Sequence, residues 1–291
     1  MKKIFLPLAG ILFAAAVLAS CTKTVSEAQF IAGAQKLSAS DIAANLSVTC
    51  ITPGSNKLVL ENKNKGVSGM WDYNVGVSTK AKDEVVVPFL GEQTIKFYAT
   101  CDTEVVLVEK KVTVTTIDFP SDPLWTIVAG STMEGKDWGW NTGLANSGCY
   151  GAGGFGWSPL YPDWNSVSSG KGEWSEVEVF PDEYLHLDLN GAANAVLHKH
   201  DGTTVKGSFS VSSAVTPEKK DVGWLGTITF RGVTPPSAFT YYGNTPVGDT
   251  FEIAKLTDTE LVLIQGDKDQ ANIFCDPNWA SASTHWCFIL K

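Results

Sequence analysis

A cluster of aromatic residues between positions 138 and 164 is the feature of this sequence best suited to chemistry at a surface. The rings are interleaved with glycines, and the candidates are Trp138, Trp140, Tyr150, Trp157, Tyr161 and Trp164. Sugar rings present apolar C–H faces that stack on aromatic rings, while neighbouring Asn and Asp side chains bind hydroxyl groups. We therefore expect a carbohydrate-binding platform. The alternative is that these rings fill a core, where most single Trp residues are found.

Two glutamates, Glu176 and Glu178, are two residues apart in an acidic stretch. A glycosidase needs two carboxyl groups about 5 to 9.5 Å apart, and residues i and i+2 of one strand fall within that range. The competing interpretation is a solvated acidic face, because charged residues are mostly exposed. Our main interpretation assigns no catalytic residue, and this pair is kept as the enzymatic alternative.

Three histidines also lie close together in the sequence. If a turn is centred near Ala192, His186 pairs across two strands with His198, and Asp188 lies on the same face. Zinc usually requires three or four converging ligands with a supporting shell. We therefore expect exposed imidazoles here, with neither a metal ion nor a cofactor.

Six cysteines permit several pairings. Cys21 belongs to the N-terminal motif described below and is not expected to pair. An odd number of cysteines remains, so at least one is a free thiol. The candidates for bridges are Cys50 with Cys101 and Cys275 with Cys287, and Cys149 is the expected free thiol. Period-two spacing points Cys50 and Cys101 into one core, where two buried thiols are the equally weighted alternative.

Short runs of Val, Ile, Thr, Leu and aromatic residues, separated by turn residues every 8 to 12 positions, predict antiparallel β-structure with little helix. We expect a domain over residues 41–117, a Pro-rich linker over 118–123 and a second domain over 124–291. The strands predicted for the first domain are Leu46–Ile51, Lys57–Asn62, Met70–Tyr73, Glu84–Phe89, Thr94–Thr100 and Val105–Thr115.

Two hairpins are predicted in the second domain. One joins Val196–His200 to Thr203–Gly207 through Asp201 and Gly202, a pair that favours a type I′ turn. The other joins Thr250–Leu256 to Glu260–Ile264.

The N-terminus has the pattern of a secretory signal peptide over residues 1–20, with a charged start, a short apolar run and small residues before Cys21. The residues Leu18, Ala19, Ser20 and Cys21 resemble a bacterial lipobox, which implies that Cys21 is acylated and becomes the mature N-terminus. Residues 21–40 would then be a lipidated tether. No transmembrane helix is expected in the mature chain.

Composition excludes some partners. The chain has a net charge of −9, and its basic residues are Lys except for Arg231. Nucleic-acid binding relies on a basic face and favours Arg, so nucleic acid is not expected as a partner. The sequence also lacks a Gly-x-Ser-x-Gly elbow and a phosphate-binding loop.

Residues 56–79, with Trp71, Asp72 and Gly76, resemble the PKD-like immunoglobulin modules of Bacteroidetes surface lipoproteins, although Val75 replaces a more usual Gly or Asp. The Cys50, Trp71, Cys101 order is similar to that of immunoglobulin-like sandwiches. The 253–264 hairpin resembles one found in Bacteroidetes lipoproteins with lipocalin-like or jelly-roll domains. The resemblance implies an all-β chain, with a PKD-like immunoglobulin-like sandwich followed by a larger jelly-roll-like β-sandwich.

With the lipobox, this architecture resembles outer-membrane lipoproteins of glycan-utilisation systems. We therefore expect a lipid-anchored protein of the bacterial outer membrane, on the cell surface or alternatively on the periplasmic face. It would bind a polysaccharide or oligosaccharide without cleaving it. Its partners would be the glycan, the lipid bilayer through acylated Cys21 and an outer-membrane transporter. The alternatives are a glycoside hydrolase or lyase, and an adhesin or structural lipoprotein with protein partners.

Overall fold

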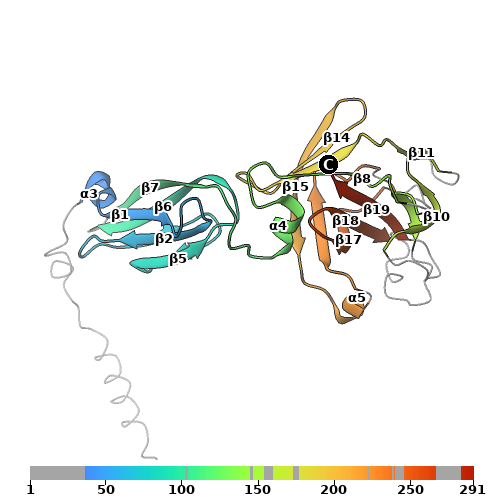
Figure 1. Ribbon diagram of the computed structural model, residues 1–291. Coiled ribbons are helices and arrows are strands. Elements are labelled where there is room, and N and C mark those ends of the chain that lie inside the picture. Colours follow the sequence, from blue (N-terminus) through green and yellow to red (C-terminus); the bar gives the residue numbers. More distant parts are fainter. Residues whose placement is uncertain are drawn as a thin grey trace, which may run out of the picture.

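The computed structural model describes residues 37–101, 104–144, 147–153, 160–172, 177–221, 223–237, 239, 246–266 and 283–291. Short antiparallel strands dominate it, and the helices α3, α4 and α5 have six residues or fewer. The strands form an N-terminal domain, coloured blue to teal, and a distal domain, coloured green to red (Figure 1). The all-β class expected from the sequence is confirmed.

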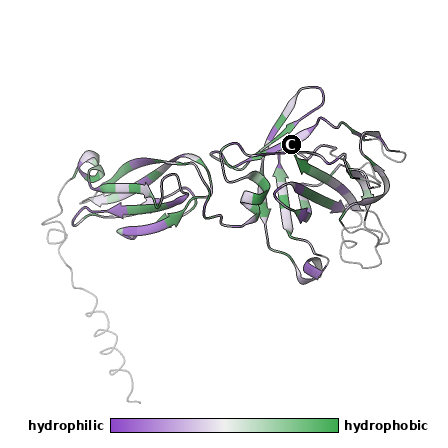
Figure 2. Cartoon of the chain, viewed as in Figure 1, coloured by the Kyte–Doolittle hydropathy of each residue, from purple (hydrophilic) through white to green (hydrophobic). Residues whose placement is uncertain are grey.

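The N-terminal domain consists of a three-stranded sheet in the order β1-β2-β5 and a four-stranded sheet in the order β4-β3-β6-β7. Buried and exposed residues alternate along these strands, and Figure 2 shows hydrophobic and hydrophilic colours side by side on them. The core contains Trp71, whose ring centroid is 4.6 Å from that of Phe97. The elements are α3 (Ala39–Ala43), β1 (Leu46–Cys50), β2 (Lys57–Asn62), β3 (Ser68–Asp72), β4 (Val77–Ser78), β5 (Lys82–Val86), β6 (Gly91–Cys101) and β7 (Glu104–Val114).

The distal domain is built on one antiparallel sheet that closes on itself. Strands β13 to β19 are neighbours in chain order, and β8 pairs with both β13 and β19, so eight strands form a barrel-like ring. Strands β9 and β10 branch from β19, and β11 pairs with β12. The elements are α4 (Leu124–Ala129), β8 (Lys136–Trp140), β9 (Tyr150–Gly153), β10 (Pro162–Val167), β11 (Gly170–Lys171), β12 (Glu178–Val179), β13 (Tyr184–Asp188), β14 (Asn194–His198), β15 (Thr204–Ser212), α5 (Pro217–Asp221), β16 (Gly226–Arg231), β17 (Thr250–Leu256), β18 (Glu260–Gly266) and β19 (Ser283–Leu290).

The strand order of the distal sheet is a meander. A jelly roll is built from Greek keys, in which neighbouring strands are not consecutive in the chain. The jelly-roll detail of the sequence-based expectation is therefore not confirmed, and neither is the immunoglobulin-like detail of the first domain.

The barrel interior is filled by side chains, as expected for a closed sheet of eight strands. Trp138 in β8 lies opposite Leu185 in β13, and both side chains are fully buried. Helix α4 lies on the side of the barrel that faces the N-terminal domain (Figure 1). The backbone carbonyl of Val128 in α4 accepts a 2.7 Å hydrogen bond from Nε1 of Trp138.

The segment 118–123 is held from both sides. The Oδ1 atom of buried Asn56 accepts hydrogen bonds from the N–H groups of Asp118 and Phe119, and Oδ1 of Asp122 accepts from the N–H of Leu124 at the start of α4. A second connection lies at Leu90, between β5 and β6. Its N–H donates to a carbonyl oxygen of the distal domain, that of Leu189, at 2.8 Å.

Candidate functional site

The rings predicted to form a sugar platform belong in part to the barrel core. Trp138 and Tyr150 have no exposed surface, and Trp140 is 4% exposed. The Trp140 ring packs against Phe288, with centroids 4.9 Å apart. The prediction of a surface platform is wrong for these three residues. Trp138 and Trp140 share a face that is the inside of a closed barrel, and the Tyr150 ring is buried against Trp140 and Trp286. Trp157 and the side chain of Trp164 lie outside the described residues.

Tyr161 is half-buried, and its hydroxyl group is engaged within the protein. It donates a 2.6 Å hydrogen bond to Oε1 of Glu260 and accepts one from Nζ of Lys255. Lys255 and Glu260 also form an ion pair at 2.7 Å. Burial, reinforced by the Glu260 carboxylate, raises the pKa of the Tyr161 hydroxyl. This network joins the end of the β17–β18 hairpin to the segment before β10, so the polar part of Tyr161 has a structural role.

The carboxylate pair is described only in part. Glu178 is exposed in the two-residue strand β12, opposite Lys171 in β11, and Glu176 lies outside the described residues. The enzymatic alternative therefore stays a prediction.

The histidine register differs from the expected one. His198 lies opposite Tyr184, and His186 lies opposite Val196, because the turn is centred on Gly191 and not on Ala192. His186 instead contacts two carboxylates, Asp137 at 2.7 Å and Asp188 at 3.3 Å. Within the described residues, no group of three or more His, Cys, Asp or Glu side chains could hold a metal ion.

The predicted bridge between Cys50 and Cys101 is not formed. Cys50 is free, and its Sγ atom lies 3.6 Å from the carbonyl oxygen of Thr113. Thr113 pairs with Glu92 near the start of β6, whereas Cys101 ends that strand. Nine residues of extended chain span about 30 Å. A shared core face does not by itself bring two cysteines within bonding distance, because these two lie at opposite ends of the domain.

Cys287 is also free and buried, so the expected bridge with Cys275 is absent, and Cys275 itself lies outside the described residues. Cys149 is also buried and unbridged in this structure, and its assignment as the unpaired thiol stays a prediction. Cys21, the predicted lipidation site, lies outside the described residues.

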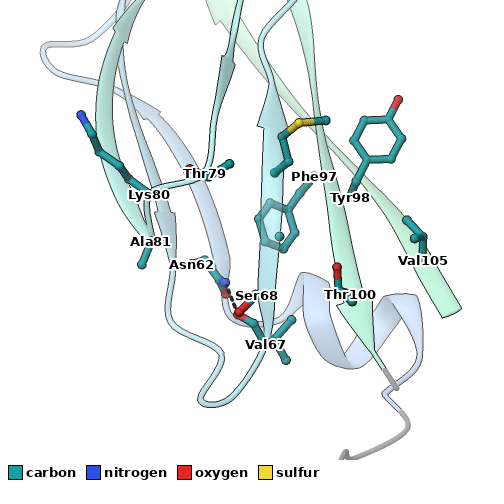
Figure 3. Close-up of a pocket in the computed structure, with 12 residues that line it drawn as sticks. Asn62, Val67, Ser68, Thr79, Lys80, Ala81, Phe97, Tyr98, Thr100 and Val105 are labelled. Carbon is teal, nitrogen blue, oxygen red and sulfur yellow. Dashed lines mark hydrogen bonds between the residues drawn. The ribbon is translucent and has the colours of Figure 1, made fainter. Parts of the chain in front are cut away.

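A groove of about 500 Å³ lies in the N-terminal domain (Figure 3). It runs over β3 and β6, from the segment before β5 to the start of β7. The lining residues are Asn62, Val67, Ser68, Gly69, Met70, Thr79, Lys80, Ala81, Phe97, Tyr98, Thr100 and Val105. Its volume falls within the usual range of small-molecule sites, which is about 300 to 1,000 Å³.

The groove exists because β3 is only half paired on one side. Strand β4 pairs with Trp71 and Asp72 of β3 but does not reach Ser68 or Gly69. Gly69, one of the lining residues, lets the Phe97 ring pack directly against the β3 backbone. A Cβ atom there would lie 2.4 Å from the Phe97 ring and 2.6 Å from the Tyr98 carbonyl oxygen. Only glycine fits this close approach without a shift of its neighbours.

The lining combines apolar and hydrogen-bonding groups on one sheet surface. Met70 and Tyr98 lie opposite each other, as do Ser68 and Thr100, so all four side chains share the outer face. Met70 is 36% exposed and Val105, further along this face, is 67% exposed. None of the lining residues is Asp, Glu, His or Cys. The lining itself thus supplies contacts for binding but no carboxylate or imidazole for acid–base catalysis.

A positive charge stands at the rim of the groove. Nζ of Lys80 forms a 2.9 Å ion pair with Asp83, whose other carboxylate oxygen accepts a hydrogen bond from Ser78. The Ser78 hydroxyl and then Lys80 lower the pKa of Asp83. Asn62, below this rim, donates to the Val67 carbonyl oxygen, as the dashed line in Figure 3 shows. The rim is therefore held in place by its own hydrogen bonds.

Sequence reasoning missed this groove because it looked for binding residues only in the second domain. Two signals were available. Gly69 interrupts a strand, which often marks close approach of another group, and Met70 and Tyr98 are apolar or aromatic at positions that alternate with the core residues Trp71 and Phe97.

The described helices are all too short to cross a lipid bilayer. No family model matches this chain, and the search of curated proteins yielded no match.

Proposed function

We propose that this protein binds a saccharide chain, without cleaving it, in the groove of its N-terminal domain, and that it does so as a lipid-anchored lipoprotein of the bacterial outer membrane. The observation that carries the proposal is the composition of the groove. A half-buried tyrosine, Tyr98, stands among hydroxyl groups on an open sheet surface, and the lining has no carboxylate, imidazole or thiol.

Saccharides have two chemical faces that this lining complements. Their C–H faces pack on aromatic and thioether groups, which Tyr98 and Met70 supply. Their hydroxyl groups exchange hydrogen bonds with side chains such as Ser68 and Thr100, which are both exposed. An open groove on a sheet also accommodates a chain that continues beyond the bound units.

The envelope location rests on the sequence. The signal peptide and lipobox imply an acyl anchor on Cys21, and two or more acyl chains hold a protein stably at a membrane. The three-on-four strand arrangement of the first domain and its buried Trp71 support an immunoglobulin-like, PKD-like module. In this proposal that module itself binds the ligand. An outer-membrane transporter would receive the bound glycan.

Isothermal titration against a panel of soluble polysaccharides tests the proposal, with Tyr98→Ala as the central variant. A sugar face covering about 60 Å² of the ring, at about 25 cal/mol per Å², contributes about 1.5 kcal/mol. Its loss should weaken binding about tenfold. Tyr184→Ala is the matched control, because Tyr184 is a half-buried tyrosine on a strand of the distal barrel. This control should leave the affinity unchanged.

Two results would count against the groove. One is the absence of binding heat with every glycan tested. The other is binding that survives Tyr98→Ala but is lost in Trp157→Ala or Trp164→Ala. That result would place the binding site in the distal aromatic cluster. Release of reducing sugar that disappears in Glu176→Gln would favour the hydrolase alternative.

A further inference from the structure

Two of the free cysteines of the distal domain are neighbours across two strands. The N–H of Cys287 in β19 donates a 2.8 Å hydrogen bond to the carbonyl oxygen of Cys149, the residue before β9. The adjacent residues Trp286 and Tyr150 are registered opposite each other in the β19–β9 pair. Cys149 and Cys287 therefore continue this antiparallel register by one step.

This register places the side chains of Cys149 and Cys287 on the same side of the sheet. Trp286 and Tyr150 are both buried, and their ring centroids are 5.8 Å apart. Since side chains alternate along a strand, the next residue of each strand faces the opposite side. Both thiols are fully buried there, and Sγ of Cys149 lies 3.3 Å from the carbonyl oxygen of Val167 in β10.

We propose that Cys149 and Cys287 form a disulfide bond in the mature protein. Disulfides join residues whose Cα atoms are about 4.4 to 6.8 Å apart, and directly opposite residues of antiparallel strands lie about 4.5 to 5.5 Å apart. In the bridged form the Cys149 sulfur exchanges its contact with the Val167 carbonyl oxygen for a bond to Cys287.

The reaction is a two-electron oxidation by thiol–disulfide exchange. The two S–H bonds break and one S–S bond forms, with loss of two protons and two electrons. The electrons pass to a disulfide oxidant, either oxidised glutathione or a protein disulfide, which becomes two thiols. Burial raises the pKa of Cys149 to about 12 and raises that of Cys287 as well, so the folded dithiol holds little reactive thiolate. The bridge therefore forms during folding, before the barrel closes.

The bond would close a loop of roughly 140 residues, and cross-links between distant residues restrict the unfolded chain most. It would also fasten the excursion between β8 and β13 to β19, the strand that closes the barrel. Cys50 and Cys101 lie in the other domain, but every thiol is accessible in the unfolded chain. The experiment must therefore separate these two and Cys275 from the proposed pair.

Refolding followed by peptide mapping tests the bridge. The full chain is unfolded in guanidinium with reductant, refolded in a glutathione redox buffer, alkylated and digested. Trypsin is unsuitable because Lys268 is the last basic residue before Lys291, so one peptide carries both Cys275 and Cys287. Cleavage before aspartate separates them. It gives 137–162 with Cys149, 269–275 with Cys275, and 276–291 with Cys287.

A peptide of 137–162 joined to 276–291, two hydrogens lighter than the sum of its parts, supports the proposal. Cys149→Ser should remove it and lower the guanidinium midpoint to that of the reduced protein, whereas Cys50→Ser should keep both. Complete alkylation of Cys149 and Cys287 after refolding, or a 269–275 peptide joined to 276–291, overturns it.

Discussion

Replacing Asn56 with alanine tests whether one buried amide holds the segment between the two domains. Asn56 has no exposed surface and makes four side-chain hydrogen bonds. Nδ2 donates to the carbonyl oxygens of Val87 and Phe119, both at 2.9 Å, and Oδ1 accepts from the N–H groups of Asp118 and Phe119. The amide thus joins the end of β5 to the start of the connection.

The loss of stability depends on how many hydrogen bonds are removed and on how many of their partners stay buried without a replacement. Each bond contributes about 1 kcal/mol net, and each partner left buried without a replacement costs about 1 to 3 kcal/mol. Water can reach the Phe119 backbone, since that residue is 42% exposed, but not as readily the Val87 carbonyl, whose residue is 1% exposed. We therefore expect Asn56→Ala to lower the free energy of unfolding by about 3 to 4 kcal/mol.

Guanidinium unfolding measures the total, and amide hydrogen exchange locates it. The N–H groups of Asp118 and Phe119 should exchange faster in Asn56→Ala, while amides of the barrel should keep their protection. Asn45→Ala is the control, because that exposed side chain makes one long hydrogen bond of 3.3 Å to Asn64. A loss below about 1 kcal/mol, or unchanged exchange at the two amides, would refute the assignment of Asn56 as the residue that holds the connection.

Three further predictions concern the core, the groove and one titration. Trp138→Phe removes the indole donor to the Val128 carbonyl and should lower the free energy of unfolding in guanidinium by about 2 kcal/mol. Glycan affinity should not change, and a loss of affinity would indicate that Trp138 contacts the glycan. Gly69→Ala should cost about 1 to 3 kcal/mol by overpacking, and a neutral thermal melt would contradict the close approach described there. The hydrogen bond with Asp182 raises the pKa of His200. This pair therefore stabilises the fold at acidic to neutral pH, and its contribution is lost as pH rises through the raised pKa. NMR titration of His200 should show a lower pKa in Asp182→Asn, and an unchanged pKa would contradict the interaction.

Much of the secondary structure followed from local patterns. The range Lys57–Asn62 was predicted and found without change, and Thr250–Leu256 was found as the first strand of its predicted hairpin. Apolar alternation with a period of two is a short-range property, so it survives whatever the strands pair with. The faces of individual strands were predictable for the same reason. Cys50 does pack against its core, although its predicted partner does not.

Turn geometry was less predictable because small changes in a loop move the register. Asp201 and Gly202 were expected to form a two-residue turn. Instead the Lys199 N–H donates to the Thr203 carbonyl oxygen, which leaves a three-residue loop with Gly202 at φ +80°. Both loops are common in hairpins and both suit Gly in the left-handed region. A difference of one loop residue therefore changes the paired residues without changing the turn signal.

The closure of the distal sheet depends on a pairing that has no local signature. Phe288 of β19 lies opposite Trp140 of β8, although these two strands are separated by nearly the whole domain. The alternation of Trp138 and Trp140 predicts one shared face in a sandwich, a barrel or a surface platform alike. Only the long-range pairing decides that this face is enclosed, which explains why the rings were expected at a surface and are found in the core.

The groove, in contrast, depends on a strand pairing that ends early, that of β4 with β3. Strand β4 consists of only two residues, Val77 and Ser78, so half of β3 keeps an open edge beside Gly69. A longer β4 would cover that edge with hydrogen-bonded backbone, and Tyr98 would then lose the concave surface beside it. The proposed binding surface is therefore set by the length of one short strand, and extending β4 should abolish glycan binding while leaving the core around Trp71 intact.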